Sequence, residues 1–209
     1  MRAHSEAEPP GTEFGWFAAL DRPKGQPVLV ALAGPNGAGK TTFYHAHLKA
    51  AGLRFLNADE ISRELGIDAY EAAQVITVLR RELVRQRESF VLETVFSDPV
   101  GDKLGFLKDA ALAGYKVVLC FIGISGPKTS EERVAMRISQ GGHAVPTEKL
   151  ISRFPRILAN LKAAVHVLPY AVLFDNDDLR TPFRKVAIYV NGKRVWSARP
   201  TPAWLKGIQ

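Results

Sequence analysis

The sequence predicts an α/β protein whose mainly parallel sheet is covered by helices on both faces, with a C-terminal β-hairpin. Strand-length apolar runs alternate with longer segments of helical periodicity, which is the pattern of parallel sheets. One of these runs, "KVVLCFIGI", is apolar throughout, as strands buried on both faces usually are. Near the C-terminus, two alternating runs flank Asn191 and Gly192, a pair that strongly favours a hairpin turn.

The first part of the chain is expected to hold a tail and two strands. Residues 1–26 form the tail, in which "FGWFAAL" is expected to dock as a short helix before "DRPKGQP" interrupts it. The run "VLVALA" at residues 28–33 is the first expected strand, and the helix that follows should end near Gly52. "RFLNAD" is the second expected strand, and it ends at Asp59.

The middle of the chain is expected to contribute a helix, a strand and a second helix. Asp68 and Glu71 have the spacing of a capping box, which predicts that a helix begins there. The apolar face expected for this helix consists of Ala72, Val75, Ile76, Leu79 and Leu83. "SFVLETVF" follows as the third strand and carries Glu93, and the next helix should close near Gly114.

The last part is expected to begin with "KVVLCFIGI" as a strand, and "SEERVAMRIS" is expected to follow as a helix. "QGGHAVP" is expected to be a loop, and "TEKLISRFPRILANLKAAVHVL" a helix that Pro155 kinks or splits. "AVLFDN" is the last expected core strand before the hairpin. The expected organisation is a tail at residues 1–26, a core at 27–180, and a hairpin with a short tail at 181–209.

Composition and charge exclude several classes of protein. The chain has 209 residues, of which 46% are hydrophobic, so it is long enough for one domain with a proper core. The longest apolar runs are too short to cross a bilayer, and no signal pattern precedes them, so a cytoplasmic protein without membrane contact is expected. The single cysteine, Cys120, allows no disulfide within the chain. The net charge of +7 fits phosphorylated ligands; nucleic acid is not favoured, because no basic run is interleaved with aromatic residues.

A glycine-rich stretch directly after the first expected strand points to nucleotide binding. It reads "GPNGAGKTT" and matches the phosphate-binding loop, or P-loop, in the strand–loop–helix context that this motif needs. Its glycines let backbone N–H groups turn toward one anion. Lys40 is expected to reach the outer phosphates of ATP, and the Thr41 hydroxyl to hold Mg²⁺. The expected nucleotide contacts are Gly34, Pro35, Asn36, Gly37, Ala38, Gly39, Lys40, Thr41 and Thr42. The fold class is therefore refined to a P-loop NTPase fold.

The other parts of the sequence distinguish between classes of P-loop protein. A GTPase should carry an Asn-Lys-x-Asp motif, and the sequence has none. "ISQGGH" loosely imitates the signature of ABC-type ATPases, and "AVLFD" imitates a Walker B strand that ends at Asp175. However, Asn176 follows where a catalytic glutamate would be required. A kinase is therefore favoured, and a nucleotide-dependent switch, which binds ATP without transferring phosphate, is the alternative outside kinases.

A kinase needs a carboxylate that accepts the proton of the acceptor hydroxyl, and two acidic residues are candidates. Asp59 is expected at the edge of the sheet where ligands bind in such folds, but an N-cap for "EISREL" explains it equally well. Glu93 lies inside an apolar strand, so it must have a charged or hydrogen-bonding partner. A structural ion pair, a substrate hydroxyl and the water shell of Mg²⁺ are the three interpretations for Glu93.

Cationic side chains near the expected loop are candidates for phosphate contacts. Arg133 and Arg137 are four residues apart and share a helical face. Arg153 and Arg156 share another face, together with Lys149 and Asn160. That face borders an apolar row made of Leu150, Phe154, Ile157 and Leu161. Arginine is suited to the border of a cleft, because its planar fork binds phosphate through two hydrogen bonds. His143, between glycines and "AVP", is a further residue in reach of phosphate or substrate.

Together, these motifs resemble the zeta toxin-like kinases. The resemblance rests on "GPNGAGKTT", "LNADEI", "VLET", "ERVAMRISQGGHAVP" and the closing "NGKRVW" with "PAW", and it covers about residues 28–204. More closely, the chain is similar to the bacterial branch often labelled predicted ABC-type ATPases. The resemblance implies a kinase that uses ATP and Mg²⁺, with UDP-N-acetylglucosamine as the first acceptor to consider. Another small molecule or a nucleic-acid end is the alternative acceptor, and a separate antitoxin chain is the further partner to consider.

The resemblance also implies roles for individual residues. Lys40 and Thr41 match the lysine and hydroxyl of the P-loop, and Asp59 matches the aspartate that the family uses as base. Glu93 matches a substrate-binding acid, with Thr94 beside it, and Arg133 matches the first phosphate-binding arginine. The sequence departs from the family at the second such arginine, where His143 stands. The charge would then come from Arg137 or Arg153, and this departure places the acceptor in question rather than phosphoryl transfer.

Overall fold

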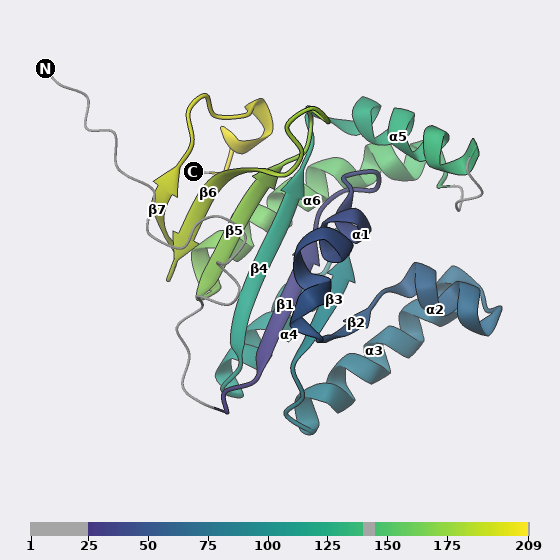
Figure 1. The fold of residues 1–209 in the computed structure, drawn as a ribbon, viewed down its shortest axis with the longest axis vertical. Helices are drawn as coiled ribbons and strands as arrows, with labels where there is room; N and C mark the ends of the chain where they lie inside the picture. The colour runs from purple at the N-terminus through teal and green to yellow at the C-terminus, as the bar shows by residue number, and fades with distance from the viewer. Residues whose placement is uncertain (1–24, 140–144, 209) are drawn as a thin grey trace, which may run out of the picture.

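The structure is a computed structural model, and it describes residues 25–139 and 145–208. In this part of the chain, seven strands form one sheet (Figure 1). The strands are β1 Val28–Ala33, β2 Arg54–Leu56, β3 Phe90–Thr94, β4 Lys116–Gly123, β5 Tyr170–Asp175, β6 Arg184–Val190 and β7 Lys193–Ser197. The helical segments are α1 Lys40–Phe43, the π-helical turn η1 Tyr44–Leu48, the 3₁₀ turn η2 Lys49–Ala51, α2 Ala58–Leu65, α3 Ala69–Arg85, α4 Asp102–Leu112, α5 Pro127–Ser139, α6 Thr147–Val167 and the 3₁₀ turn η3 Ala203–Leu205.

The sheet has the strand order β2-β3-β1-β4-β5-β6-β7. The first five strands in this order are parallel, and β6 and β7 add an antiparallel edge. The hairpin turn lies at Asn191 and Gly192, which both have positive φ, as the sequence pattern predicts. The expected α/β P-loop fold with its C-terminal hairpin is confirmed, and the hairpin continues the same sheet as the core.

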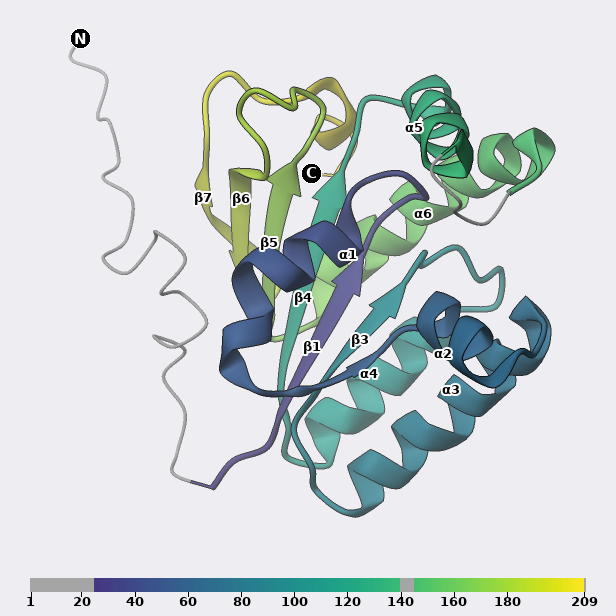
Figure 2. The ribbon, with the colours of Figure 1, turned by 45° about the vertical axis from the view of Figure 1, so that its right-hand side comes forward.

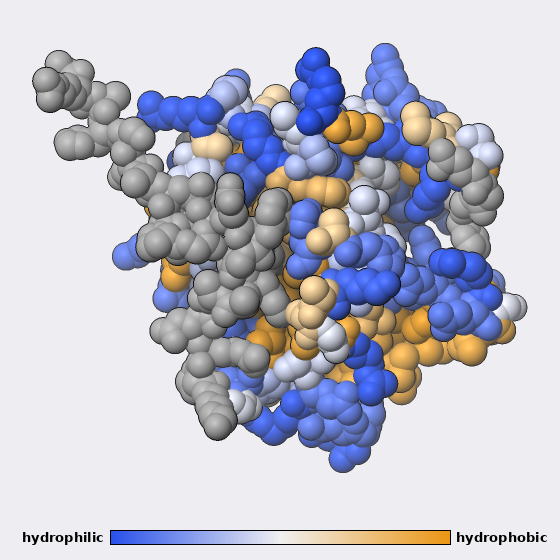
Figure 3. Space-filling model, in the orientation of Figure 1, coloured by the Kyte–Doolittle hydropathy of each residue, from blue (hydrophilic) through white to orange (hydrophobic). Residues whose placement is uncertain are grey.

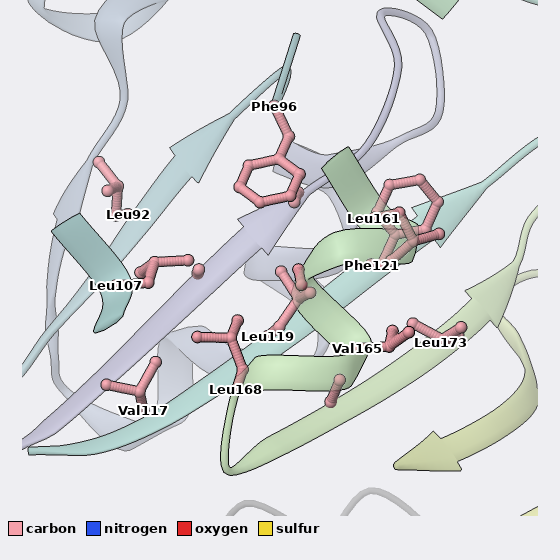
Figure 4. Close-up of a cluster of buried hydrophobic side chains, with 14 of the residues drawn as sticks. Leu92, Phe96, Leu107, Val117, Leu119, Phe121, Leu161, Val165, Leu168 and Leu173 are labelled. Atoms are coloured by element: carbon pink, nitrogen blue, oxygen red, sulfur yellow. The ribbon is translucent and has the colours of Figure 1, made fainter. Parts of the chain in front are cut away.

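Helices cover both faces of the sheet (Figure 2). Alternate residues of β1 point to opposite faces, so Val28, Val30 and Leu32 pack against the helical run after the P-loop. Leu29, Ala31 and Ala33 face the other side, where α3, α4 and α6 contribute their buried residues. Figure 4 shows part of this second core, in which Leu107 of α4 and Leu161 of α6 lie near the strand residues Leu119 and Leu173. The site at the end of β1 therefore rests on a sheet that is packed on both sides.

The buried face of α3 differs from the one predicted. The capping box of Asp68 and Glu71 is confirmed, and Ala72, Ile76 and Leu83 are buried. Leu79, by contrast, is 37% exposed, and Arg80 takes the inward position with 4% exposure. The reason is that Arg80 has partners in α4: it pairs with Asp102 and lies over the ring of Phe106. Val75, Val78 and Leu79 then lie in a surface groove with Leu65 and Ile67, in the region of α2 and α3 where Figure 3 shows an apolar surface.

The structure corrects one further expectation, and two others concern residues that it does not describe. Helix α6 runs through Pro155 without interruption, so the predicted split is wrong. Pro155 lies inside α6 on an exposed face, whereas the predicted apolar row Leu150, Phe154, Ile157 and Leu161 is buried. The stretch "FGWFAAL" and His143 lie outside the described residues. Among the helices that are described, none has the length and apolar character needed to cross a bilayer.

Candidate nucleotide and acceptor site

The P-loop forms the turn that its glycines predict. It begins where β1 ends, and α1 starts at Lys40. Gly39 adopts a left-handed conformation with φ of 89°, and a Cβ atom there would lie 2.8 Å from the amide nitrogen of Asn176. At Gly34, a side chain would collide with the carbonyl oxygen of Ile122 on β4. The backbone N–H of Ala38 donates to the carbonyl of Pro35 at 3.2 Å, which closes the turn. The loop therefore needs glycine both for its conformation and for its close packing.

The helical run after the loop reaches Gly52, as expected, but it is not a uniform α-helix. One turn of α1 is followed by the π-helical turn Tyr44–Leu48 and by a 3₁₀ turn. Phe43 packs at 4.8 Å from Phe174 and at 5.2 Å from Phe183, measured between ring centroids. These contacts fix the run against the sheet, and Lys40 and Thr41 at its start are held in place with it.

Lys40, Thr41 and Glu93 form the centre of the site. The side chain of Lys40 is 6% exposed, and its ammonium group donates to the carbonyl of Pro35 at 3.1 Å and lies 3.7 Å from Glu93 Oε1. The hydroxyl of Thr41 donates to Glu93 Oε2 at 2.9 Å. Glu93 reaches both because β3 is the neighbour of β1 and pairs it with Leu32. The acid inside the apolar strand thus has its partners in the P-loop.

Burial changes the protonation energetics of Lys40. Desolvation lowers the pKa of Lys40, and the negative charge of Glu93 opposes this shift. A buried ammonium group with one carboxylate partner gains further from any anion placed beside it. The position of Lys40 is therefore suited to a phosphate group.

Asn57 is a site residue that the sequence analysis missed. Its side-chain oxygen accepts hydrogen bonds from the backbone N–H groups of Asp59 at 2.8 Å and of Glu60 at 3.2 Å. Its amide nitrogen donates to Glu93 Oε2 at 2.9 Å. Asn57 is therefore the N-cap of α2 and a support for Glu93 at the same time. The signal for it in the sequence is an asparagine three residues before Glu60, the spacing of a helix start.

This arrangement corrects both structural expectations for Asp59. The strand β2 ends at Leu56, so Asp59 does not end it, and the cap of α2 is Asn57 rather than Asp59. Asp59 is the second residue of α2, its side chain is 57% exposed, and its carboxylate lies 3.7 Å from a guanidinium nitrogen of Arg137. It faces the cavity that the P-loop also lines. A carboxylate that does not hold the helix start remains available for chemistry.

Helix α5 stands over the P-loop and brings its arginines to the site. In both ribbon views α5 lies on one side of the loop, and α2 and α3 lie on the other (Figure 1 and Figure 2). The hydroxyl of Ser130 donates to the carbonyl of Asn36 at 2.6 Å. The guanidinium of Arg133 donates to the carbonyls of Asn176 at 2.7 Å and of Asp177 at 2.9 Å. Arg133 thus ties α5 to the loop after β5 and lies beside the P-loop.

The loop after β5 contacts the P-loop and supports it. Asn176 is 3% exposed, and its amide group donates to the carbonyl of Ala38 at 2.8 Å and accepts from the backbone N–H of Phe183 at 3.2 Å. Its own backbone N–H donates to Gly123 at the end of β4. Asn176, the residue that argues against an ABC-type ATPase, therefore has a structural function. The sequence pattern alone does not indicate this function.

These elements enclose a cavity of about 570 Å³, a volume typical of small-molecule sites. The predicted residues that line it are Asn36, Gly37, Gly39, Lys40, Thr41, Thr42, Asp59, Glu93, Thr94, Arg133, Arg137 and Arg153. Gly34, Pro35 and Ala38 belong to the loop but do not line the cavity. The hydroxyl of Thr94 accepts from the backbone N–H of Phe96 at 3.1 Å, so it also shapes the turn after β3. Arg156, on the same helix as Arg153, does not reach the cavity.

The donor set at Thr41 fits a magnesium ion. Mg²⁺ prefers oxygen ligands and is usually held by one or two protein groups together with phosphates and water. The Thr41 hydroxyl and the Glu93 carboxylate supply such oxygens side by side. When bound, Mg²⁺ would neutralise charge on the phosphate oxygens.

The fold and this site define a P-loop α/β protein with the P-loop NTPase fold. The family model described as AAA domain, AAA_33, matches residues 29–154, which is more than half of the chain. The chain therefore belongs to this AAA domain family. No curated protein matches the sequence at a significant level.

Solved structures with the same fold include an AvrRxo1 complex and a toxin–antitoxin system. The complex of AvrRxo1-ORF1 and AvrRxo1-ORF2 with sulphate ions has a TM-score of 0.65 at 21% identity, and the match covers 81% of this chain and 60% of that one. The same complex with ATP has a TM-score of 0.54 at 20% identity, with the same coverage. The PezAT toxin–antitoxin system of Streptococcus pneumoniae has a TM-score of 0.52 at 19% identity, covering 79% of this chain and 72% of that one. The chain thus spans 60% of the length of the AvrRxo1 chain that it matches.

Proposed function

We propose that this protein is an ATP- and Mg²⁺-dependent kinase of the zeta toxin type, which transfers the γ-phosphoryl group to a hydroxyl of a small molecule. The observation that carries the proposal is the cavity itself. It brings the exposed carboxylate of Asp59 together with the P-loop residues Lys40 and Thr41. A switch that only binds ATP needs the P-loop, but it does not need an exposed carboxylate in the same cavity.

The residues of the site divide the work of phosphoryl transfer. The P-loop backbone and Lys40 hold the phosphates, and Thr41 with Glu93 would hold the metal ion. Asp59 accepts the proton of the acceptor hydroxyl while the oxygen of that hydroxyl forms the new bond to the γ-phosphorus. The bond between that phosphorus and the β–γ bridging oxygen breaks, and ADP leaves. Arg137, beside Asp59, and Arg133 supply positive charge as negative charge spreads over the phosphoryl oxygens.

The comparisons and the sequence pattern support this proposal from separate directions. A structure of the same fold was solved with ATP, and another belongs to a toxin–antitoxin system. The motifs "LNADEI", "VLET" and "GGHAVP" are similar to zeta toxin-like kinases, for which UDP-N-acetylglucosamine is the acceptor. This nucleotide sugar is the first acceptor that we propose, and a separate antitoxin chain is the protein partner.

Phosphate transfer from labelled ATP to a panel of acceptors tests the proposal. The panel contains UDP-N-acetylglucosamine, other nucleotide sugars, nucleosides and oligonucleotide 5′-ends. Lys40→Met, which keeps the side-chain length but removes the charge, should lower transfer by roughly 10²- to 10³-fold. Lys49→Met, on the exposed side of the same helical run, is the matched control. Robust ATP hydrolysis without transfer to any acceptor would contradict a kinase. Tight ATP binding with neither transfer nor hydrolysis would favour a switch.

Growth of a bacterial host tests the acceptor separately. If UDP-N-acetylglucosamine is phosphorylated in the cell, precursors of the wall are depleted, and growing cells that express the wild-type protein lyse. Cells that express Lys40→Met should grow normally. Equal growth with both proteins, at equal expression, would point to another acceptor and would leave phosphoryl transfer untouched.

A further inference from the structure

A second group of charged side chains lines the same cavity outside the P-loop. Arg80 comes from α3, Lys103 from the first turn of α4 and Arg153 from α6. We call these three residues the cationic cluster. They are far apart in the sequence, and only Arg153 was singled out by its pattern. Asp102, next to Lys103, lines the cavity beside them.

Arg80 is held in an unusual environment for an arginine. Its side chain is 4% exposed, and its guanidinium donates to Asp102 Oδ2 at 2.7 Å and lies 4.5 Å from the centroid of the Phe106 ring. Its Nε atom is buried and has no hydrogen-bond partner among the described residues. Asp102 is itself 52% exposed, so it compensates the buried charge only in part. A buried arginine with this pairing indicates that the cavity wall is built to carry positive charge.

Lys103 and Arg153 add to this charge. Burial lowers the pKa of Lys103, the carboxylate of Asp98 opposes the shift, and the nearby charges of Arg80 and Arg153 reinforce it. Arg153 is half-buried at the cavity wall. Three cations thus share this wall with the carboxylate of Asp102, and the carboxylate of Asp98 lies near Lys103 without lining the cavity. The surplus is positive, although the phosphate-binding end of the cavity has separate cations of its own in the P-loop and α5.

We propose that the cationic cluster binds an anionic group of the acceptor, so that the acceptor is a phosphate- or carboxylate-bearing molecule with a hydroxyl to be phosphorylated. This inference rests on the proposed kinase function and deepens it. The cavity holds a small molecule between the two ends: the hydroxyl lies at Asp59, and the anionic group contacts Lys103 and Arg153. Arg80, which Asp102 and Phe106 hold in place, lies buried in the cavity wall, and its positive charge attracts the same anionic group.

The test separates anion binding from catalysis. The protein is saturated with Mg²⁺ and a non-hydrolysable ATP analogue, which occupies the P-loop, and sodium sulfate is then titrated while the melting temperature is recorded. A bound anion raises the melting temperature in a saturable way. The double variant Lys103→Met with Arg153→Gln should bind sulfate more weakly by about tenfold or more, because it removes two charge-assisted contacts. The control is Lys108→Met with Arg156→Gln, which changes exposed residues of the same two helices.

The control also accounts for the general effect of sulfate on stability, which acts equally on all variants. Equal saturation in the double variant and in the control would overturn the proposal, as would a wild-type protein with no saturable response. A parallel titration with malonate distinguishes the two anion classes: tighter binding of sulfate indicates a phosphate-bearing acceptor, and tighter binding of malonate a carboxylate-bearing one.

The outcome is distinguishable from failure of the kinase proposal. Sulfate binding that is lost in the double variant supports the cluster even when no acceptor in the panel is phosphorylated. Conversely, once an acceptor is known, the double variant should raise its KM far more than it lowers kcat. Transfer to that acceptor with an unchanged KM would refute the cluster and leave the kinase intact.

Discussion

The two ends of the cavity are built in different ways. The phosphate-binding end consists of consecutive residues, 34–42, and depends on backbone geometry and on one lysine. The opposite wall consists of Arg80, Lys103 and Arg153, which three separate helices bring together. A phosphate-binding loop of consecutive residues can be used in any nucleotide-dependent reaction. A wall formed by side chains of separate helices can instead differ between proteins that use different acceptors. For the proposed kinase, the comparison indicates that phosphate binding and acceptor choice are separable, and variants at the two ends of the cavity test that separation.

The largest effect is expected for Asp59→Asn. A general base contributes roughly 10²- to 10⁴-fold to the rate, so phosphoryl transfer should fall by about that factor. ATP affinity should not change, because Asp59 lies outside the P-loop. Stability should change little, since Asn57 rather than Asp59 caps α2. Transfer assays, ATP titration and thermal melting measure the three properties.

Glu64→Gln is the matched control, because it removes an exposed carboxylate from the same helix. It should behave like the wild type in all three measurements. An Asp59→Asn protein with full transfer activity would mean that another group accepts the proton, and Glu93 is then the carboxylate to test.

The next effect is expected for Lys40→Met. Loss of a charge that stabilises the transition state should lower transfer by roughly 10²- to 10³-fold, and ATP affinity should fall with it. The melting temperature of Lys40→Met should not fall below that of the wild type at neutral pH. Burial lowers the pKa of Lys40, so its charged form opposes folding at every pH below that lowered pKa. This opposition fades as the pH rises from the lowered pKa toward the ordinary value of 10.5. A clear loss of melting temperature in Lys40→Met would contradict this account.

A smaller effect separates the two N-caps of the neighbouring helices. Asn57→Ala removes the cap of α2 and one hydrogen bond to Glu93, whereas Asp68→Ala removes only the cap of α3. Each should lower stability by about 1 kcal/mol. Only Asn57→Ala should also lower the transfer rate, because Glu93 accepts a hydrogen bond from the Thr41 hydroxyl, the oxygen that we propose binds Mg²⁺.

Asn57→Asp provides a rescue test for this pair. Aspartate caps a helix as well as asparagine does, but it places a negative charge beside Glu93 and no longer donates to it. Stability should return in large part, and the transfer rate should not. Equal rates in Asn57→Asp and the wild type would show that Asn57 acts only as a cap.

The smallest effect is expected at the cationic cluster. The pKa of Lys103 is lowered, so its charged form is disfavoured in the folded state below that pKa, and this penalty fades as the pH rises toward 10.5. Lys103→Met should therefore melt at least as high as the wild type at neutral pH, with the difference shrinking at alkaline pH. Lys108→Met, an exposed change in the same helix, should show no such pH dependence. A lower melting temperature for Lys103→Met would indicate that Asp98 holds Lys103 in a stabilising pair.

Much of the fold and part of the site follow from local sequence patterns. The P-loop, the capping box at Asp68, the strand that carries Glu93 and the hairpin at Asn191 each depend on neighbouring residues, and each was predicted correctly. The N-cap interpretation of Asp59 was wrong because two polar residues lie near one helix start, and Asn57, which caps it, also donates a hydrogen bond to Glu93 on another strand. The face of α3 was predicted only in part for a similar reason: Arg80 is buried where Leu79 was expected, and the burial of Arg80 depends on Asp102 and Phe106 of α4.

The sequence by itself determined the nucleotide-binding end of this protein, because glycine conformation, a lysine and a hydroxyl act within one short segment. Only the tertiary structure decided which side chains line the rest of the cavity. Strand order places Glu93 beside Thr41, the packing of α5 brings Arg133 and Arg137 over the loop, and three helices meet to place Arg80, Lys103 and Arg153 on one wall. Contacts of this kind join residues distant in the chain, and their energies depend on burial and on partners that no local pattern contains.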